Sequence, residues 1–482
     1  MHTRPPQNLK RGVLIASVLL IGTVAAASGH RYFPIGGGGT EPANPLTTTS
    51  RTSGTVTVSG KLDRNRVLVN GDGTVRMELT LEGEDRIAAG AEATPTDLFV
   101  VLDRSGSMSG EKLAQAKTAT LELLDQLGPR DRFSLITYES GVRMEIVLAE
   151  AHGDNVSRWR AIVDSLDTAG GTNMSAGLDL AHQSVLLGRQ ANRASRVILL
   201  SDGQANEGDA SVAGLTRRAT LAARNEYVLS TVGIGQGFNE ELMTALANNG
   251  TGNFYYVDER TALAGVFSDE FNSARETVAS GLAVILETPD GVTVEDAAGY
   301  ALERVNGSST VFRPGTLFAG QKRTIWVRYR VPTTGAGDIR LGTVRAEFSD
   351  RGERFRADLS SLPVIARVRD EGEFYAGINK DVWGNGIAVD ELNALRMEVS
   401  SAIQSGDREG AKQAIEEYRV QNQALNDKLQ MPAVAESIES TRALERDLDD
   451  AFSGPDTTSK RNRMSKKLKA KGFDGRRSGA KY

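Results

Sequence analysis

The spacing of apolar residues divides this chain into four segments. Over 54–82 apolar and polar residues alternate, which is typical of strands with one buried face. Over 97–275 unbroken apolar runs alternate with stretches in which apolar residues recur every three or four positions. Short alternating runs return over 280–368, and only the helical spacing remains over 389–452. The pattern predicts a β-rich part, an α/β part, a second β-rich part and a helical part.

The segment 97–275 predicts a doubly wound, Rossmann-like α/β domain. Unbroken apolar runs are typical of strands buried on both faces, as in a mainly parallel sheet covered by helices. The predicted strands cover 98–102, 133–138, 197–200, 228–234 and 254–257. The predicted helices cover 111–127, 154–166, 174–187, 210–225, 240–247 and 261–274. Residues 144–148 follow the second strand closely and are expected to form an antiparallel edge strand.

The strands on either side of this domain are expected to share one β-sandwich. Those within 54–96 are too few for a stable sheet of their own. Those within 276–370 are short, are separated by Gly and Pro turns, and are typical of an antiparallel sandwich. Residues 70–73 (Asn-Gly-Asp-Gly) predict a hairpin turn, and one continuous strand is expected over 339–348. We therefore predict that the α/β domain is inserted into a split β-sandwich, which is tolerated where chain ends lie close together.

Residues 371–452 predict a small helical region, with helices over 389–403, 407–426 and 432–452. Gly406 and Pro432 separate these helices, since Gly often ends a helix and Pro often begins one. The apolar periodicity is lost over 453–482, and residues 460–482 carry ten Lys and Arg against one acid. This end is expected to be a disordered basic tail, suited to an anionic surface.

The N-terminus has the pattern of an export signal. Three basic residues within the first eleven precede an apolar run over 13–27, and small residues follow it. The run is shorter than a full membrane span of roughly 20 residues. Residues 1–29 are therefore interpreted as a signal peptide, with an uncleaved membrane anchor as the alternative. Residues 30–53 are expected to be a flexible linker, and the remainder of the chain is expected in the periplasm or at the cell surface.

Composition excludes several kinds of site. The chain has no Cys, which excludes disulfides, thiolate metal sites and a Cys nucleophile. Its sequence contains neither a phosphate-binding loop of the Gly-x-x-x-x-Gly-Lys type nor a Gly-x-Ser-x-Gly nucleophile elbow. The four His residues show no pairing that suggests a catalytic triad or a metal pair. Because export is expected, nucleic acid is not expected as a partner.

Three predicted loops at one edge of the α/β sheet carry hydroxyl and carboxylate groups. The first loop carries Asp103, Ser105 and Ser107, the second Thr172 and the third Asp202. In open α/β sheets ligands bind at the carboxyl ends of the strands, so the loops are expected to converge. All five side chains are hard oxygen donors that suit Mg²⁺, with Mn²⁺ or Ca²⁺ as alternatives, and not zinc. Taken singly, such residues also form turns and cap helices, but their combination predicts a metal site.

These loops resemble the metal-ion-dependent adhesion site of von Willebrand factor type A domains, the family that includes integrin I domains. The family pattern is matched by Asp103, Ser105, Ser107, Thr172 and Asp202. The resemblance covers about 97–275, and the whole chain is more loosely similar to exported bacterial type A proteins and to inter-alpha-trypsin inhibitor heavy chains. It implies a Mg²⁺ ion whose open position is filled by a Glu or Asp of a partner protein. It also implies that Asp103 holds the ion's waters and the neighbouring hydroxyls.

We therefore predict a metal-dependent adhesion or scaffold protein of the cell envelope, and not an enzyme. The alternative is an envelope hydrolase that uses the same ion as a Lewis acid. That reaction needs a general base beside the metal, and no such residue is evident in the sequence. A third interpretation is a subunit in which the site is purely structural.

Overall fold

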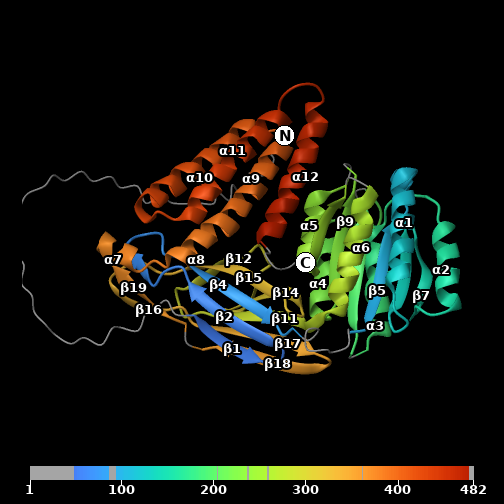
Figure 1. Cartoon of the computed structure of the whole chain (residues 1–482), viewed down its shortest axis with the longest axis horizontal. Helices are drawn as coiled ribbons and strands as arrows, with labels where there is room; N and C mark the ends of the chain where they lie inside the picture. The colour runs from blue at the N-terminus through green and yellow to red at the C-terminus, as the bar shows by residue number, and fades with distance from the viewer. Residues whose placement is uncertain are drawn as a thin grey trace, which may run out of the picture.

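The computed structural model describes residues 48–85, 94–190, 192–202, 205–235, 238–257, 260–360 and 362–476. It consists of an α/β domain, a β-sandwich and a group of C-terminal helices that lie against one another (Figure 1). The predicted fold class, an α/β domain inserted into a sandwich and followed by helices, is confirmed. The predicted export segment at 1–29 and most of the predicted linker at 30–53 lie outside the described residues. None of the helices in the described ranges combines the length and apolar character needed to span a membrane.

In the described residues, six strands form the sheet of the α/β domain, in the order β10-β9-β8-β5-β6-β7. They are β5 (Thr96–Asp103), β6 (Arg132–Tyr138), β7 (Val142–Glu150), β8 (Ala194–Ser201), β9 (Val228–Ile234) and β10 (Thr251–Val257). Neighbours are parallel except β7, which pairs antiparallel with β6 as predicted for residues 144–148. The central strand β5 is buried along its whole length.

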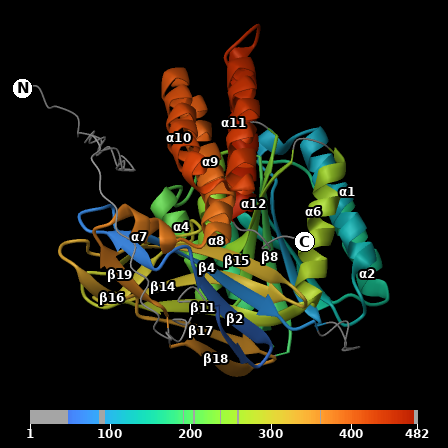
Figure 2. The ribbon, with the colours of Figure 1, turned by 60° about the vertical axis from the view of Figure 1, so that its left-hand side comes forward.

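Helices cover both faces of this sheet (Figures 1 and 2). They are α1 (Glu111–Gln126), α2 (Asp154–Asp164), α3 (Met174–Gly188), α4 (Val212–Arg224), α5 (Glu240–Asn249) and α6 (Arg260–Arg275). Leu98, Val100 and Leu102 of β5 share a core with α1, α2 and α6. Phe99 and Val101 point to the other side, into a core shared with α3, α4 and α5. Burial on both sides explains why this strand is apolar at successive positions.

Over the ranges that the structure describes, two five-stranded antiparallel sheets form the sandwich. One has the order β1 (Thr49–Ser53), β2 (Val56–Leu62), β4 (Thr74–Gly83), β15 (Lys322–Arg330) and β12 (Thr293–Ala297). The other has the order β13 (Glu303–Asn306), β14 (Ser309–Phe318), β11 (Thr277–Glu287), β17 (Thr343–Asp350) and β18 (Glu353–Leu359). The segments before and after the α/β domain are joined where β4 pairs with β15, from Thr74 opposite Arg330 to Glu82 opposite Lys322. The apolar faces of both sheets form one core.

Three local predictions in this part are wrong. Residues 70–73 do not close a hairpin, because the short strand β3 (Arg66–Leu68) leaves β4 and pairs in parallel with β19 (Val364–Val368). The strand expected over 339–348 is divided into β16 (Gly337–Arg340) and β17, since the chain turns at Gly342 with a φ of 103°, which glycine adopts most readily. The end of the predicted linker forms the edge strand β1, whose backbone pairs with β2.

The C-terminal part contains six helices in the described residues. They are α7 (Glu371–Ala376), α8 (Lys380–Asn385), α9 (Leu392–Ser405), α10 (Arg408–Leu429), α11 (Pro432–Ala451) and α12 (Thr457–Arg476), with a π-helical turn at Gly386–Glu391. Gly406 ends α9 in the left-handed conformation, and Pro432 occupies the first turn of α11. Arg64 anchors this part to the sandwich, since its guanidinium lies 3.8 Å from the ring centroid of Trp383.

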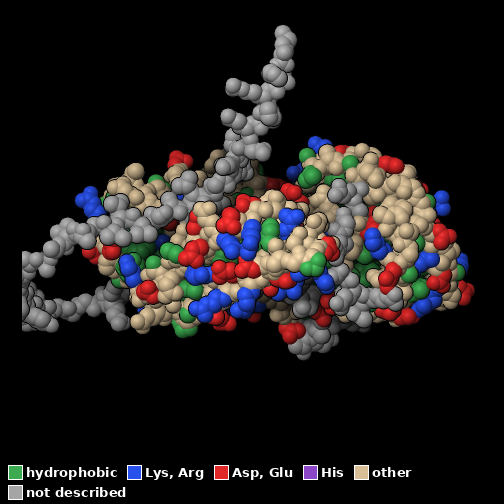
Figure 3. Space-filling model, turned by 90° about the horizontal axis from the view of Figure 1, so that it is seen from above, with side chains coloured by type: hydrophobic (Ala, Val, Ile, Leu, Met, Phe, Trp, Pro, Cys, Tyr) green, Lys and Arg blue, Asp and Glu red, His purple; other side chains and the backbone are tan. Residues whose placement is uncertain are grey.

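The disordered basic tail predicted at 453–482 is wrong for residues 457–476, which form α12. This helix packs closely along α9 (Figure 2). It also contacts β10. Leu468 and the small residues Ser465 and Gly472 are buried, so packing depends partly on close approach and not on a broad apolar stripe. Figure 3 shows basic and acidic side chains interspersed over the face that carries these helices. Residues 477–482 lie outside the described residues.

Candidate metal site

Backbone hydrogen bonds connect two of the three loops at the carboxyl edge of the sheet. The loop after β5 contains a 3₁₀ turn at Gly106–Met108. The N–H of Arg104 donates to Tyr138 O at 2.9 Å, and the C=O of Arg104 accepts from Ala169 N at 2.8 Å. The N–H of Gly106 donates to Gly170 O at 3.2 Å. The loop that carries Asp103, Ser105 and Ser107 is therefore fixed against the loop that carries Thr172.

Four of the five predicted site residues are joined by hydrogen bonds. Asp103 Oδ1 accepts from the backbone N–H of Ser105 at 2.9 Å. The hydroxyls of Ser105 and Ser107 lie 3.1 Å apart, and Ser107 Oγ donates to Asp202 Oδ1 at 2.8 Å. Asp103, Ser105 and Asp202 are buried, whereas Ser107 is exposed. The cluster therefore opens to solvent beside Ser107.

Thr172, the fifth residue, lies in the adjoining loop. Its N–H donates to Asn206 Oδ1 at 2.9 Å, and its C=O accepts from Asn206 N at 3.1 Å and from Glu207 N at 3.3 Å. Asn173 caps α3 by accepting from Ala176 N at 3.2 Å. Within the described residues, Thr172 makes no hydrogen bond to the other four predicted site residues. Its position follows from the contacts of its loop with the other two loops.

Asp103 is held by groups beneath the cluster. Ser201 Oγ donates to Asp103 Oδ2 at 2.7 Å, so that both carboxylate oxygens of Asp103 accept a hydrogen bond. Burial raises the pKa of Asp103 above its ordinary value, and the nearby charge of Asp202 adds to this, while hydrogen bonds from Ser105 and Ser201 oppose it. The carboxylate is therefore oriented by the protein and gains from a cation nearby.

The donor set fits a hard divalent cation. Two carboxylates and three hydroxyls are oxygen ligands, which Mg²⁺ prefers, and the chain has no thiolate to favour zinc. Within the described residues, no group of three or more His, Asp or Glu side chains is placed to hold a metal by itself. A metal at this edge would therefore be held partly by the neutral hydroxyls of Ser105, Ser107 and Thr172.

Residues 97–269 match the family described as von Willebrand factor type A domain. This part of the chain belongs to that family. Type A domains in general mediate interactions between proteins. The match covers the α/β domain with its three loops and leaves the sandwich and the C-terminal helices outside it.

Relatives extend the likeness beyond the type A domain. The protein named uncharacterized protein sll0103, from Synechocystis sp., is 24% identical over 347 residues, which cover 69% of this chain and 81% of that protein. Human inter-alpha-trypsin inhibitor heavy chain H4 is 31% identical over 184 residues, but these are 36% of this chain and 20% of the heavy chain. The solved structure of a von Willebrand factor type A protein from Catenulispora acidiphila aligns with a TM-score of 0.66 at 18% identity, over 88% of this chain and 97% of that one. The comparison with the Catenulispora acidiphila structure shows that the two proteins share their fold over most of this chain.

In the described part of the chain, Ser201, Asn206 and Lys112 contact site residues and are not among the predicted ligands. Ser201 supports Asp103, Asn206 holds the backbone of Thr172, and Lys112 contacts Asp202. Ser201 directly precedes Asp202, and Lys112 lies in the first turn of the helix that follows the first loop. Their closeness to the motif in the sequence was the signal that could have indicated Ser201 and Lys112. A Ser or Lys at such a position, however, is not distinctive.

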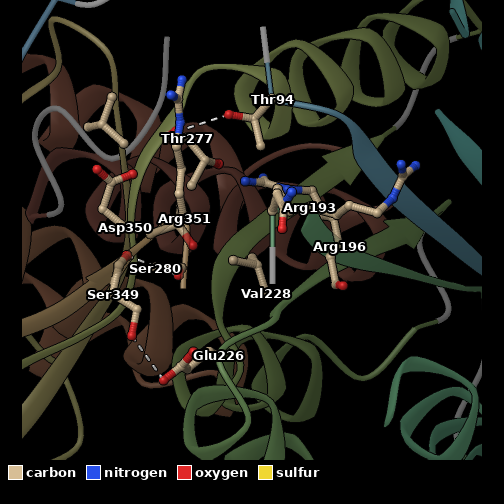
Figure 4. Close-up of a pocket in the computed structure, with 15 residues that line it drawn as sticks. Thr94, Arg193, Arg196, Glu226, Val228, Thr277, Ser280, Ser349, Asp350 and Arg351 are labelled. Atoms are coloured by element: carbon tan, nitrogen blue, oxygen red, sulfur yellow. Dashed lines mark hydrogen bonds between the residues drawn. The ribbon is translucent and has the colours of Figure 1, made fainter. Parts of the chain in front are cut away.

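A polar pocket lies at the opposite, amino edge of the type A domain, where it meets the sandwich (Figure 4). Ser349 Oγ donates to Glu226 Oε1 at 3.3 Å across this junction, and Thr94 Oγ1 donates to Thr277 O at 3.4 Å. The backbone N–H of Thr94 donates to Arg275 O at 2.8 Å, so the two ends of the domain are tied together there. The sandwich therefore holds the amino edge and leaves Ser107 exposed at the carboxyl edge.

Proposed function

We propose that this chain is a metal-dependent protein-binding protein of the cell envelope. Asp103, Ser105, Ser107, Thr172 and Asp202 hold Mg²⁺, and an acidic residue of a partner protein completes the coordination of the ion. The observation that carries this proposal is the hydrogen-bonded cluster of Ser105, Ser107 and Asp202. This cluster lies beside the carboxylate of Asp103, which is oriented by a hydrogen bond from Ser201. The export pattern of residues 1–29 supports a location in the periplasm or at the cell surface.

The chemistry of the donors favours capture of an acidic group. Three of the five donors are neutral hydroxyls, so an ion bound there keeps part of its positive charge. Mg²⁺ usually keeps exchangeable waters, and a carboxylate from another protein can replace one of them. Ser107 is exposed, so the cluster is reached from solvent on that side.

Two ionisable groups near the cluster, Tyr138 and Glu139, are poor candidates for the general base that the hydrolase alternative would need. Tyr138 is buried, and burial raises its pKa well above the ordinary value, so its hydroxyl keeps its proton at neutral pH. Hydrogen bonds from the backbone of Gly141 and Ser140, with the charge of Arg104, lower the pKa of Glu139. A carboxylate with a lowered pKa is a weak base. These properties favour binding over catalysis.

The proposal is tested by capture from envelope extract on the immobilised protein in Mg²⁺, followed by elution with EDTA. We expect a partner that elutes with EDTA and is not captured by Asp103→Ala or Thr172→Ala. Thr118→Ala is the control, because Thr118 lies exposed on α1 and its hydroxyl donates to Ala114 O of the same helix. Capture that withstands both EDTA and the two site substitutions would refute the proposal. Turnover of a substrate that is lost in the same two variants would support the hydrolase instead.

A further inference from the structure

The side chain of one lysine, Lys112, contacts residues of the candidate metal site. Lys112 lies in the first turn of α1, one helical turn beyond the loop that carries Ser105 and Ser107. Its ammonium donates to the backbone carbonyl of Ser107 at 3.1 Å and contacts Asp202 Oδ2. Asp202 Oδ1 accepts from Ser107 Oγ at 2.8 Å. The Asp202 carboxylate thus has one oxygen on the ammonium and the other within the hydroxyl cluster.

The surroundings of Lys112 direct its ammonium to this place. The Asp202 side chain is fully buried, whereas 36% of the Lys112 side chain is exposed, so the ammonium reaches the carboxylate from the solvent side. Gly235, directly after β9, lies beside the aliphatic part of the lysine, since a Cβ on this glycine would be in ordinary van der Waals contact with Lys112 Cε, at 3.4 Å. A charge pair that is partly buried is screened less by water than a pair on the surface.

The cationic side chain within the motif itself, that of Arg104, points away from the Asp202 carboxylate. Arg104 lies between Asp103 and Ser105 in the sequence, but its guanidinium donates to Asp167 O at 3.1 Å and to Glu139 Oε1 at 3.5 Å. Lys112 is therefore the cation that meets the carboxylate of Asp202 among the residues described around the cluster. A divalent ion that binds the five predicted ligands has to share this carboxylate with the ammonium or displace it.

We propose that Lys112 competes with the divalent ion for Asp202 and so weakens metal binding at this site. The inference rests on the proposed function, because it assumes that Asp202 is a metal ligand. A hydrogen bond between two charged groups contributes enough to weaken the binding of a competing ion by roughly ten- to a hundred-fold. The site then binds Mg²⁺ reversibly, and the ammonium of Lys112 pairs with the buried carboxylate of Asp202 when the ion dissociates.

The test is calorimetric titration of the whole 482-residue chain with MgCl₂ alone. Lys112→Met keeps an aliphatic side chain of similar length without the charge, and we expect it to bind Mg²⁺ at least tenfold more tightly than the unchanged protein. Lys112→Arg keeps a cation at this place and is expected to stay weak. Lys117→Met is the matched control, since Lys117 lies on the same helix and donates to Asp164 O, away from the site. An equal or weaker affinity in Lys112→Met would overturn the inference.

A titration in 0.5 M KCl separates direct competition from general repulsion between cations. Screening by salt reduces interactions between separated charges, whereas a contact between ammonium and carboxylate is less affected. We expect the gain in Lys112→Met to persist at high salt, and a gain that disappears there would refute competition for Asp202. If neither the unchanged protein nor Lys112→Met binds Mg²⁺, the metal site itself fails, and with it the proposed function. If the unchanged protein binds Mg²⁺ but Lys112→Met shows no gain, only the competition fails.

Thermal unfolding of the same variants shows whether they fold. In EDTA we expect a lower Tm for Lys112→Met than for the unchanged protein, because the buried carboxylate of Asp202 loses its charged partner. In saturating MgCl₂ this difference is expected to shrink, because the ion replaces the ammonium as the partner of the carboxylate. A difference in Tm that is the same in EDTA and in MgCl₂ would contradict the inference.

Discussion

Ser201 donates a hydrogen bond of 2.7 Å to Asp103, and this bond joins the carboxyl ends of two neighbouring strands, β8 and β5. Both side chains are fully buried, so water does not readily replace the bond. It fixes one oxygen of the carboxylate, while the backbone N–H of Ser105 fixes the other. The geometry of the candidate metal site therefore depends on a residue that is not itself one of the predicted ligands.

We expect Ser201→Ala to weaken Mg²⁺ binding by about tenfold, which is the lower end of the range for substitutions that remove support from a metal ligand. The physical reason is that Asp103 then loses the donor to Oδ2 and is less well oriented. Calorimetric titration with MgCl₂ measures the effect. Ser184→Ala is the control, since Ser184 is half-buried on α3 and donates to Leu180 O of its own helix. Equal loss in both variants would speak against a specific role for Ser201.

Mg²⁺ is expected to raise the Tm of the protein, because an ion that binds only the folded state stabilises that state. At a free concentration one hundred times the Kd, the gain is about 2.7 kcal/mol. Mn²⁺ is expected to raise the Tm as well, since it also takes hard oxygen donors. Scanning calorimetry in EDTA, MgCl₂ and MnCl₂ checks both expectations. Asp202→Asn should remove the Mg²⁺ response, and a response that survives in this variant would place the ion elsewhere.

A buried ion pair connects β8 with α6 inside the type A domain. Arg196 contacts Glu270, which also accepts hydrogen bonds from Tyr255 at 2.7 Å and from Asn253 at 2.8 Å. Burial alone would raise the pKa of Glu270, but Arg196 and these hydrogen bonds outweigh it, so the pKa lies below the ordinary value of 4.5. A lowered pKa means that the charged form of Glu270 is favoured in the folded state.

We expect Glu270→Gln to destabilise the protein by about 3–5 kcal/mol at neutral pH, because it leaves the guanidinium of Arg196 buried without a charged partner. The stability that the Glu270 charge contributes is present above pH 4.5 and is lost as the pH falls towards the lowered pKa of the folded state. The difference between the two proteins should therefore shrink below about pH 4.5. Urea unfolding across this range measures it, with the exposed Glu241→Gln as control. A difference in the free energy of unfolding that grows as the pH falls would contradict the lowered pKa of Glu270.

Helix α12 should be released from α9 by Gly472→Val. A Cβ at Gly472 would lie 2.7 Å from Met397 Cγ and 2.8 Å from Asn393 O on α9, so a larger side chain forces the helices apart. Lys466 is buried and its ammonium donates to Phe238 O at 3.3 Å. The Nζ of Lys469 lies 3.8 Å from Glu240 Oε1. These contacts protect both lysines from trypsin in the folded protein. We expect trypsin to cut at these lysines about tenfold faster in the variant, since a difference of about 1.4 kcal/mol in local opening gives this factor.

The control for this experiment is Asn462→Val, which places the same β-branched side chain at an exposed position of α12. Mass spectrometry of the first fragments identifies the cleavage sites. Unchanged protection of Lys466 and Lys469 in Gly472→Val would show that close packing on α9 does not hold the helix.

The sequence determined the α/β domain and where its candidate site lies, because both depend on regularities between near neighbours. A strand covered on both faces must be apolar at successive positions, as Leu98 to Leu102 are. The loops that follow such parallel strands lie at one edge of the sheet, so Asp103 and Asp202 were expected there. That these residues bind a metal remains a prediction.

The packed fold, and not a local pattern, sets the partner of β3, the helical state of α12 and the contacts of Ser201 and Lys112. The sequence did not reveal them, because each depends on residues that are distant in the chain and that have no periodic pattern. Ser465 on α12, for example, donates to Glu240 on α5 at 3.1 Å across a separation of 225 positions. Local periodicity describes which face of an element is buried, whereas the fold alone determines which distant side chains meet that face.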